Sequence, residues 1–211
     1  AADGARFVDV FCEHGVFGLE ESRRILLAGK ACGLVPRLHA DELTPLGGAR
    51  LAAEVGALSA DHLLFAQPDG IHAMAKAGVV ATLLPGTSVF LRMNRYAPAR
   101  EMVSAGVAVA LGTDCNPGSS YTESLPAVAF FAAIGMGLTV EETLVAMTLN
   151  AAASIGEAAR RGSLEPGKAA DVVLVDGPNI EHLVYHYGVN PVTDVVVAGV
   201  PVVRDGRRVP V

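Results

Sequence analysis

The sequence predicts an α/β protein: a partial TIM-type (β/α) barrel with about five of eight βα units, followed by part of a small β-sandwich module. Short apolar runs alternate with amphipathic, Ala-rich stretches, which is the pattern of βα units around a parallel sheet. The apolar runs end about every 25 residues, as expected for consecutive units of a barrel. After residue 160, short β-branched runs separated by turn residues replace this pattern.

Each predicted βα unit has a strand and a helix with its own end signal. A glycine that follows an amphipathic stretch is a typical helix end, and such glycines occur at 33, 56, 78 and 106. The predicted strands are Phe7–Cys12, Pro36–His39, Asp61–Phe65, Val79–Leu84 and Val107–Gly112. The predicted helices between them are Glu20–Ala31, Gly47–Glu54, Pro68–Ala77 and Pro98–Ala105.

Two further helices are predicted before the pattern changes, at Ser124–Met136 and Val140–Ile155. The second opens with Thr139 followed three residues later by Glu142, the spacing of a capping box. The β module is expected to contain the strands Ala170–Val175, Asp194–Ala198 and Val200–Arg204. We therefore divide the chain into a partial barrel with C-terminal helices, residues 1–160, and part of a composite β module, residues 161–211.

Five βα units cannot close an eight-stranded barrel, and an open half-barrel exposes two strand edges and its interior face. We expect the chain to be a piece of a longer protein or to associate with its missing part. An open, doubly wound sheet is the competing architecture, but its ligand site normally lies at one switch point. Polar groups at several strand ends favour the barrel.

The composition excludes some classes of partner. A net charge of -6 argues against nucleic acid and against an anionic membrane, since both favour a basic surface. The hydrophobic content of 51% fits a globular protein that binds a small molecule. Three cysteines without CxxC spacing favour a reducing, cytoplasmic environment.

The strongest candidate site residues are His39, His62 and Asp114, each near the end of a predicted strand. Two imidazoles and a carboxylate at one mouth are suited to hold a metal and to transfer a proton. Glu42 follows His39 by three residues, where it can face a substrate. Taken singly, each has another explanation: a strand-end His bonded to a carbonyl, a solvated Glu, or an Asp in a turn. Their common spacing favours metal-assisted hydrolysis.

Two other segments leave alternatives open. The Gly/Pro/Ser-rich loop after Asp114 is able to present backbone N–H groups to an anion, but it also fits an Asx-type turn. His182 and His186 have the i, i+4 spacing of a helical metal pair, and the residues around them suit a packing loop equally well.

Several motifs together resemble the imidazolonepropionase family of the amidohydrolase superfamily over essentially the whole chain. The shared segments are residues 7–13, 39–42, 59–62, 84–87, 113–118, 162–171 and 181–190. The resemblance implies hydrolysis of the cyclic amide 4-imidazolone-5-propanoate to N-formimidoyl-L-glutamate in histidine degradation. It also implies one divalent metal, zinc or iron.

Carried over residue by residue, the resemblance implies that His39 and Asp114 are metal ligands and that Glu42, His62 and Asp114 are catalytic. It assigns substrate binding to Glu42, Asn116, Gly118 and Ser119. The family's His-x-His metal pair has no counterpart in this sequence, so a missing N-terminal segment is needed for a complete site. A related deaminase acting on an aminated heterocycle and an inactive fragment remain as alternatives, and a homodimer is left open.

Overall fold

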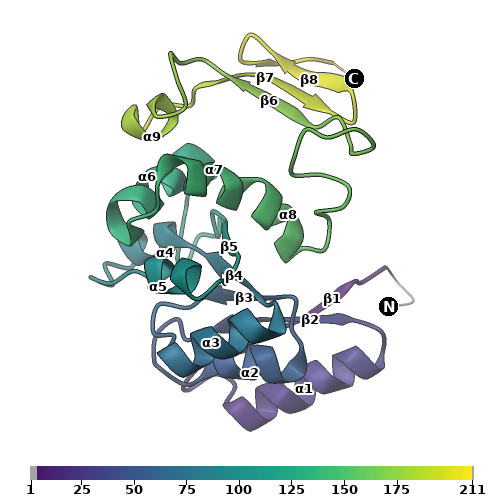
Figure 1. Cartoon of the computed structure of the whole chain (residues 1–211), viewed down its shortest axis with the longest axis vertical. Coiled ribbons are helices and arrows are strands. Elements are labelled where there is room, and N and C mark those ends of the chain that lie inside the picture. Colours follow the sequence, from purple (N-terminus) through teal and green to yellow (C-terminus); the bar gives the residue numbers. More distant parts are fainter. Residues whose placement is uncertain (1–3, 211) are drawn as a thin grey trace.

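Five parallel strands in sequential order form the larger sheet of the computed structural model, which describes residues 4–210 (Figure 1). All four neighbouring pairs are parallel, so each connection crosses back over the sheet. The strands are β1 (Phe7–Cys12), β2 (Val35–Ala40), β3 (Ser59–His62), β4 (Val80–Leu83) and β5 (Val109–Leu111). Their order confirms the predicted fold class of consecutive βα units.

The connecting helices cover one face of this sheet and lie below it in Figure 1 for the first three units. They are α1 (Leu19–Ala31), α2 (Gly48–Val55), α3 (Pro68–Ala77) and α5 (Ala99–Ser104), and the short α4 (Pro85–Phe90) between β4 and α5 packs against α6 (Leu125–Met136). The predicted helix Pro68–Ala77 agrees residue for residue with α3. The short α4 was not predicted from Pro85-Gly86, although proline is favoured in the first turn of a helix.

One row of side chains across the sheet defines the core. Val10, Leu38, Ala60, Ala81 and Val109 are register partners on successive strands. Each is buried, and all belong to the same apolar cluster beneath the helices. Because side chains alternate along a strand, the neighbouring positions face the opposite side, which is the interior of the barrel.

Most predicted bounds differ from the observed ones by at most two residues, and two predictions are wrong by more. The third strand ends at His62 and not at Phe65, because His62 and Leu63 adopt positive φ angles of 73° and 61°, outside the extended region. The predicted helix Val140–Ile155 is two helices, α7 (Val140–Met147) and α8 (Leu149–Ser154). Thr148 separates them with a non-helical φ of -119°, and its Oγ1 donates to the carbonyl of Leu144 at 2.6 Å.

The other C-terminal helix signals are confirmed. Helix α6 (Leu125–Met136) begins after Ser124, whose side chain accepts from the Ala127 N–H at 3.3 Å. Thr139 and Glu142 form the expected capping box at the start of α7. No helix among residues 4–210 is both long and apolar enough to cross a membrane.

The smaller sheet is antiparallel and lies at the top of Figure 1. It contains β6 (Val172–Val175), β7 (Val192–Val197), β8 (Val200–Arg204) and β9 (Arg207–Arg208). The turn between β7 and β8 has positive φ at both Ala198 (50°) and Gly199 (82°), as the predicted hairpin requires. The boundary between the partial barrel and the β module, placed after residue 160, stays a prediction.

A short helix, α9 (His182–Tyr185), lies in the connection between β6 and β7 and packs against α6. Phe130 and Tyr187 stack with ring centroids 4.2 Å apart. The rings of His182 and His186 are 5.0 Å apart, and no third His, Cys, Asp or Glu completes a metal group with them within residues 4–210. These observations favour a packing role for this segment.

Candidate active site at the carboxyl ends of the strands

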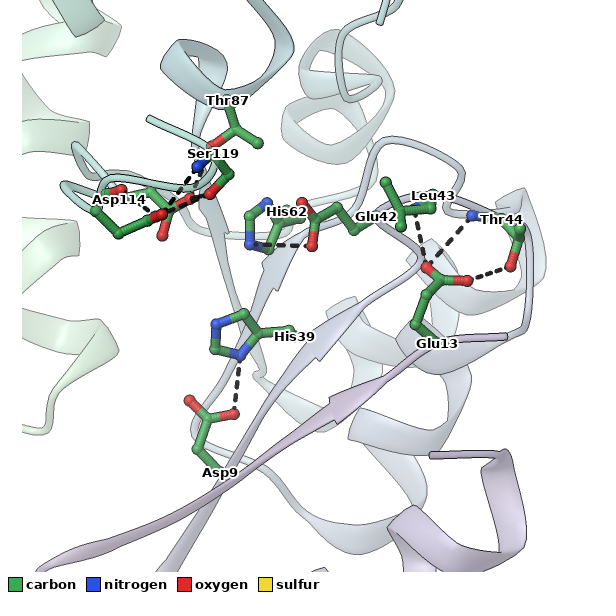
Figure 2. A network of polar contacts seen from close by, with 11 residues as sticks. Asp9, Glu13, His39, Glu42, Leu43, Thr44, His62, Thr87, Asp114 and Ser119 are labelled. Atoms are coloured by element: carbon green, nitrogen blue, oxygen red, sulfur yellow. Dashed lines mark hydrogen bonds and ion pairs between the residues drawn. The ribbon is translucent and has the colours of Figure 1, made fainter. Parts of the chain in front are cut away.

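The structure brings four predicted side chains to one end of the larger sheet (Figure 2). His39 lies near the end of β2, Glu42 lies in the loop that follows, and His62 ends β3. The His39 and His62 rings are 5.3 Å apart, and His62 Nε2 lies 3.6 Å from Glu42 Oε2. Asp114 follows β5 and faces the same space (Figure 2).

The backbone is strained at two of these residues. His62 and Asp114 have φ angles of 73° and 50°, in the left-handed region that non-glycine residues seldom adopt. Such conformations cost roughly 1–3 kcal/mol each and persist where surrounding contacts impose them.

A buried carboxylate fixes the start of the loop that carries Glu42. Asp41 has a φ of 49°, and its side chain accepts hydrogen bonds from three backbone N–H groups at the start of α2. The donors are Gly47 at 2.7 Å, Gly48 at 2.9 Å and Ala49 at 2.8 Å. A carboxylate at this position also complements the helix dipole.

A second buried carboxylate, Glu13, fixes the end of the same loop (Figure 2). It accepts from the Leu43 N–H at 2.8 Å, the Thr44 N–H at 3.3 Å and the Thr44 hydroxyl. Burial raises the pKa of Glu13. These hydrogen bonds, together with one from the His14 N–H, lower it by more than burial raises it, so the pKa lies below its usual value. The sequence analysis missed this role.

The environments of Glu42 and His62 shift their pKa values in opposite directions. Burial, then the nearby Asp114 carboxylate, raises the pKa of Glu42 to about 7. Burial, then the nearby His39, lowers the pKa of His62 to about 4. Near neutral pH, therefore, Glu42 retains a proton in a large fraction of molecules and His62 is a neutral imidazole. Such a pair is suited to general acid–base chemistry.

His39 is oriented by a residue that the sequence analysis did not identify. Its Nδ1 lies 3.0 Å from Asp9 Oδ1. The hydrogen bond with Asp9 raises the pKa of His39, against the opposing effect of burial. The available signal was the position of Asp9 between apolar residues of β1, where alternation turns it toward the barrel interior.

Asp114 is held by two hydroxyl groups. Thr87 Oγ1 donates to Asp114 Oδ2 at 2.8 Å, and Ser119 Oγ donates to the same oxygen at 3.2 Å. Thr87 is buried in the first turns of α4, so the helix missed by the sequence analysis supplies this contact. Oδ1 of Asp114 has no partner among the described residues, which leaves it available to a ligand.

The loop after Asp114 forms an internally bonded turn. Asn116 Oδ1 accepts from the N–H groups of Gly118 and Ser119, both at 2.8 Å. Asn116 Nδ2 donates to the Asp114 carbonyl at 2.7 Å and to Ser119 Oγ at 2.8 Å. This is the Asx-type geometry that the sequence left open. The substrate-binding role of Asn116, Gly118 and Ser119 stays a prediction.

The donor set fits a metal ion in part. His39 presents a second ring nitrogen, Asp114 presents a free carboxylate oxygen, and the buried His62 Nδ1 has no hydrogen-bond partner among residues 4–210. Buried polar atoms are seldom left unpaired, so this atom indicates a site that is completed by a ligand. Two protein ligands are fewer than the three or four usual for zinc.

The chain belongs to the amidohydrolase family, whose family model matches residues 39–209. Among curated proteins, it is 56% identical over 203 residues to the imidazolonepropionase of Geobacillus kaustophilus (strain HTA426). It is 57% identical over 202 residues to that of Shouchella clausii (strain KSM-K16). The matches cover 96% of this chain but 48% and 45% of those proteins, so the chain spans about half the length of the curated relatives it matches.

Among solved structures, the chain is similar to an adenosine deaminase from Xanthomonas campestris with bound zinc. The TM-score is 0.77 and the identity is 25%, with 98% of this chain and 53% of that chain covered. The likeness agrees with the amidohydrolase fold.

Proposed function

We propose that the chain contributes the later half of an active site that hydrolyses 4-imidazolone-5-propanoate to N-formimidoyl-L-glutamate, a step of histidine degradation. The observation that carries this proposal is the meeting of Glu42, His62 and Asp114 at the strand ends, with His62 Nε2 3.6 Å from Glu42 Oε2. The raised pKa of Glu42 and the lowered pKa of His62 fit a proton donor beside a neutral imidazole. Identity of 56% to an imidazolonepropionase supports the choice of substrate.

One divalent metal, zinc or iron, would be held by His39 and Asp114 together with ligands from a segment outside this chain. The bound zinc of the similar adenosine deaminase supports this part of the proposal. When bound, such a metal acidifies water and polarises a carbonyl group. The relatives are about twice as long as the matched region, which supports the proposal that the remaining ligands come from a further segment.

The chain's own residues then have defined tasks. Asp114 accepts a proton from water at a carboxylate oxygen, and His62 relays it to Glu42, where it replaces the proton that Glu42 gives to the substrate. The oxygen of water bonds to the carbonyl carbon, the ring C–N bond breaks, and Glu42 gives its proton to the departing nitrogen. His62 also stabilises the negative charge that develops on the carbonyl oxygen.

The loop containing Asn116, Gly118 and Ser119 would bind the propanoate carboxylate. In the structure, the N–H groups of Gly118 and Ser119 both donate to Asn116 Oδ1. Substrate binding at these amides therefore requires the carboxylate to replace the oxygen of Asn116. Glu42 would contact a ring nitrogen in the same complex.

The direct test is a substrate panel with the longer protein that contains these residues. We expect loss of 4-imidazolone-5-propanoate with formation of N-formimidoyl-L-glutamate, and no ammonia from aminopurines. Ammonia release from an aminopurine with no turnover of the imidazolone would contradict the proposal.

That opposite outcome identifies the second candidate, a deaminase of aminated heterocycles, which the fold similarity to the adenosine deaminase favours. The third candidate is that this chain alone is an inactive partner of its missing half. Elemental analysis tests this third candidate, because tight, stoichiometric metal in the 211-residue chain would show that its metal site is complete without another segment.

We also propose a cytoplasmic location and a small-molecule substrate, without nucleic-acid or membrane partners, and we keep a homodimer as a proposal. The three cysteines are free in the structure, which supports a reducing compartment. Light scattering of the purified protein measures the oligomeric state.

A further inference from the structure

A ladder of polar residues lines the interior face of the larger sheet. Asp9 on β1 is opposite Arg37 on β2, and Arg37 is opposite Ser59 on β3. One step toward the carboxyl ends, His39 is opposite Asp61. Register partners in a parallel sheet face the same side, so all five side chains share this interior surface.

The contacts divide the ladder into a group of three, Arg37, Ser59 and Asp61, and a pair, His39 and Asp9. Arg37 donates to Asp61 Oδ2 at 3.1 Å and to Ser59 Oγ at 2.8 Å. His39 Nδ1 instead contacts Asp9 Oδ1 at 3.0 Å. Asp61 therefore contacts Arg37 and Asp9 contacts His39, although both carboxylates lie on the same surface.

The carboxylates of Asp9 and Asp61 are both close enough to the His39 imidazole to be its hydrogen-bond partner. Ligand atoms of Asp9, His39 and Asp61 all lie within 4.8 Å of one another, the spacing of a possible cation site. Arg37 already supplies a positive charge to the buried carboxylate of Asp61, with a side-chain exposure of 9% for that residue. A second cation on Asp61 would have to displace or oppose this guanidinium.

We propose that Asp9 is a positioning residue that accepts the Nδ1–H of His39 and so leaves Nε2 unprotonated, and that Arg37 keeps Asp61 from competing for the imidazole. Figure 2 shows the second ring nitrogen of His39 on the side away from Asp9. The hydrogen bond to one ring nitrogen sets which nitrogen is free to bind a metal. The tautomer claim stands alone, and only its purpose rests on the proposed metal-dependent function.

The first test measures the tautomer directly, without metal or substrate. Long-range ¹H–¹⁵N NMR of the histidine-labelled 211-residue chain at pH 9, with His39 assigned by a His39→Gln variant, reports which ring nitrogen carries the proton. We expect the Nδ1–H form in the native chain. Asp9→Ala should shift the ratio toward Nε2–H by roughly tenfold, the scale of one charge-assisted hydrogen bond.

Two further variants distinguish positioning from general disturbance. Asp9→Asn keeps a carbonyl acceptor and should retain the native tautomer. Asp61→Asn also removes one negative charge, from β3 on the other side of His39, and should retain the native tautomer, because Asp61 contacts Arg37. An unchanged tautomer in Asp9→Ala, or an equal shift in Asp61→Asn, would overturn the proposal.

Binding of Co²⁺ to the longer protein that contains these residues, carrying the same substitutions, tests the purpose of this arrangement. We expect Asp9→Ala to weaken binding roughly 10- to 100-fold and Asp61→Asn to leave it within about threefold. Equal losses would indicate that Asp9, His39 and Asp61 themselves hold the cation, which contradicts the inference. If the native longer protein binds no Co²⁺, the metal in the proposed function is contradicted, and the tautomer comparison still decides the role of Asp9.

Discussion

Glu42 shows most clearly how one residue's surroundings give it a chemical task. Its carboxyl group is buried, lies near Asp114 and contacts His62 at 3.6 Å. Taking a carboxylate out of water disfavours its charged form, and a second negative charge nearby adds to this effect. A side chain that would otherwise be ionised at neutral pH can therefore hold a proton for transfer.

Glu42→Gln should stabilise the metal-free chain at pH 8. The folded-state pKa of about 7 exceeds the ordinary value of 4.5, so the folded state binds more protons than the unfolded state between these pH values. The free energy of unfolding therefore falls as pH rises through this window. Removing the buried charge should recover up to about 3 kcal/mol at pH 8 and nothing near pH 4. Urea denaturation at both pH values measures this; equal effects at both would contradict it.

Thr87→Val should reduce kcat of the complete enzyme roughly tenfold, because Asp114 loses the hydroxyl donor at 2.8 Å. Thr87→Ser is the matched control, since it keeps the hydroxyl and should retain most of the activity. Steady-state kinetics separates the two variants. Similar rates for the Val and Ser variants would show that this hydrogen bond does not position Asp114.

At the scale of elements, the loop between β2 and α2 holds Glu42 between two buried carboxylates. Asp41 binds the first N–H groups of α2, and Glu13, the residue after β1, binds the backbone of Leu43 and Thr44. The start of α2 and the residue that follows β1 therefore hold this loop together. A loop carrying a proton donor needs such support to keep the donor in place.

Glu13→Gln should destabilise the chain by about 1–3 kcal/mol at pH 7, because its hydrogen bonds favour the ionised acceptor. The folded-state pKa of Glu13 is lowered from 4.5, so the stabilisation is present above that value and is lost as pH falls through the folded-state pKa. Thermal unfolding of both chains at pH 7 and pH 3 measures the change. The difference should narrow in acid, and a constant difference would exclude the carboxylate as its source.

The break between α7 and α8 has a packing consequence at Gly162. This glycine has a φ of 93°, and an added Cβ would lie 2.9 Å from the Thr148 carbonyl oxygen and from Leu149 Cα. Gly162→Ala should cost more than about 2 kcal/mol, from backbone strain together with this clash. Gly167→Ala is the control, because its φ of 91° is similar and nothing lies within 4 Å. Equal losses of unfolding free energy in denaturant would contradict the packing argument.

These elements also explain what the sequence could predict. Glycines at 56 and 78 end helices with left-handed caps, a requirement that is local and visible in the sequence. The break at Thr148 lies inside a continuous apolar pattern, so periodicity did not reveal it; the Thr148 hydroxyl bonds to the Leu144 carbonyl at this point. His39, His62 and Asp114 were predictable because strands of similar spacing end at one edge. Their partners Asp9 and Thr87 come from other elements and required the fold.

At the scale of the whole molecule, the five-stranded sheet gathers groups from most of the chain at one end. Glu13 comes from the end of β1 and Asp114 from the end of β5, about a hundred residues apart along the sequence, yet both affect Glu42. The amidohydrolase family match and the half-length coverage of relatives agree with such a site being shared with a further segment.

The most direct test of the central proposal is the kcat for 4-imidazolone-5-propanoate of the complete enzyme with Asp114→Ala, measured beside Asp205→Ala. Asp205 lies at the turn between β8 and β9, away from the strand ends of the larger sheet. The proposal predicts no measurable turnover for Asp114→Ala and native turnover for Asp205→Ala. A near-normal kcat for Asp114→Ala would contradict it.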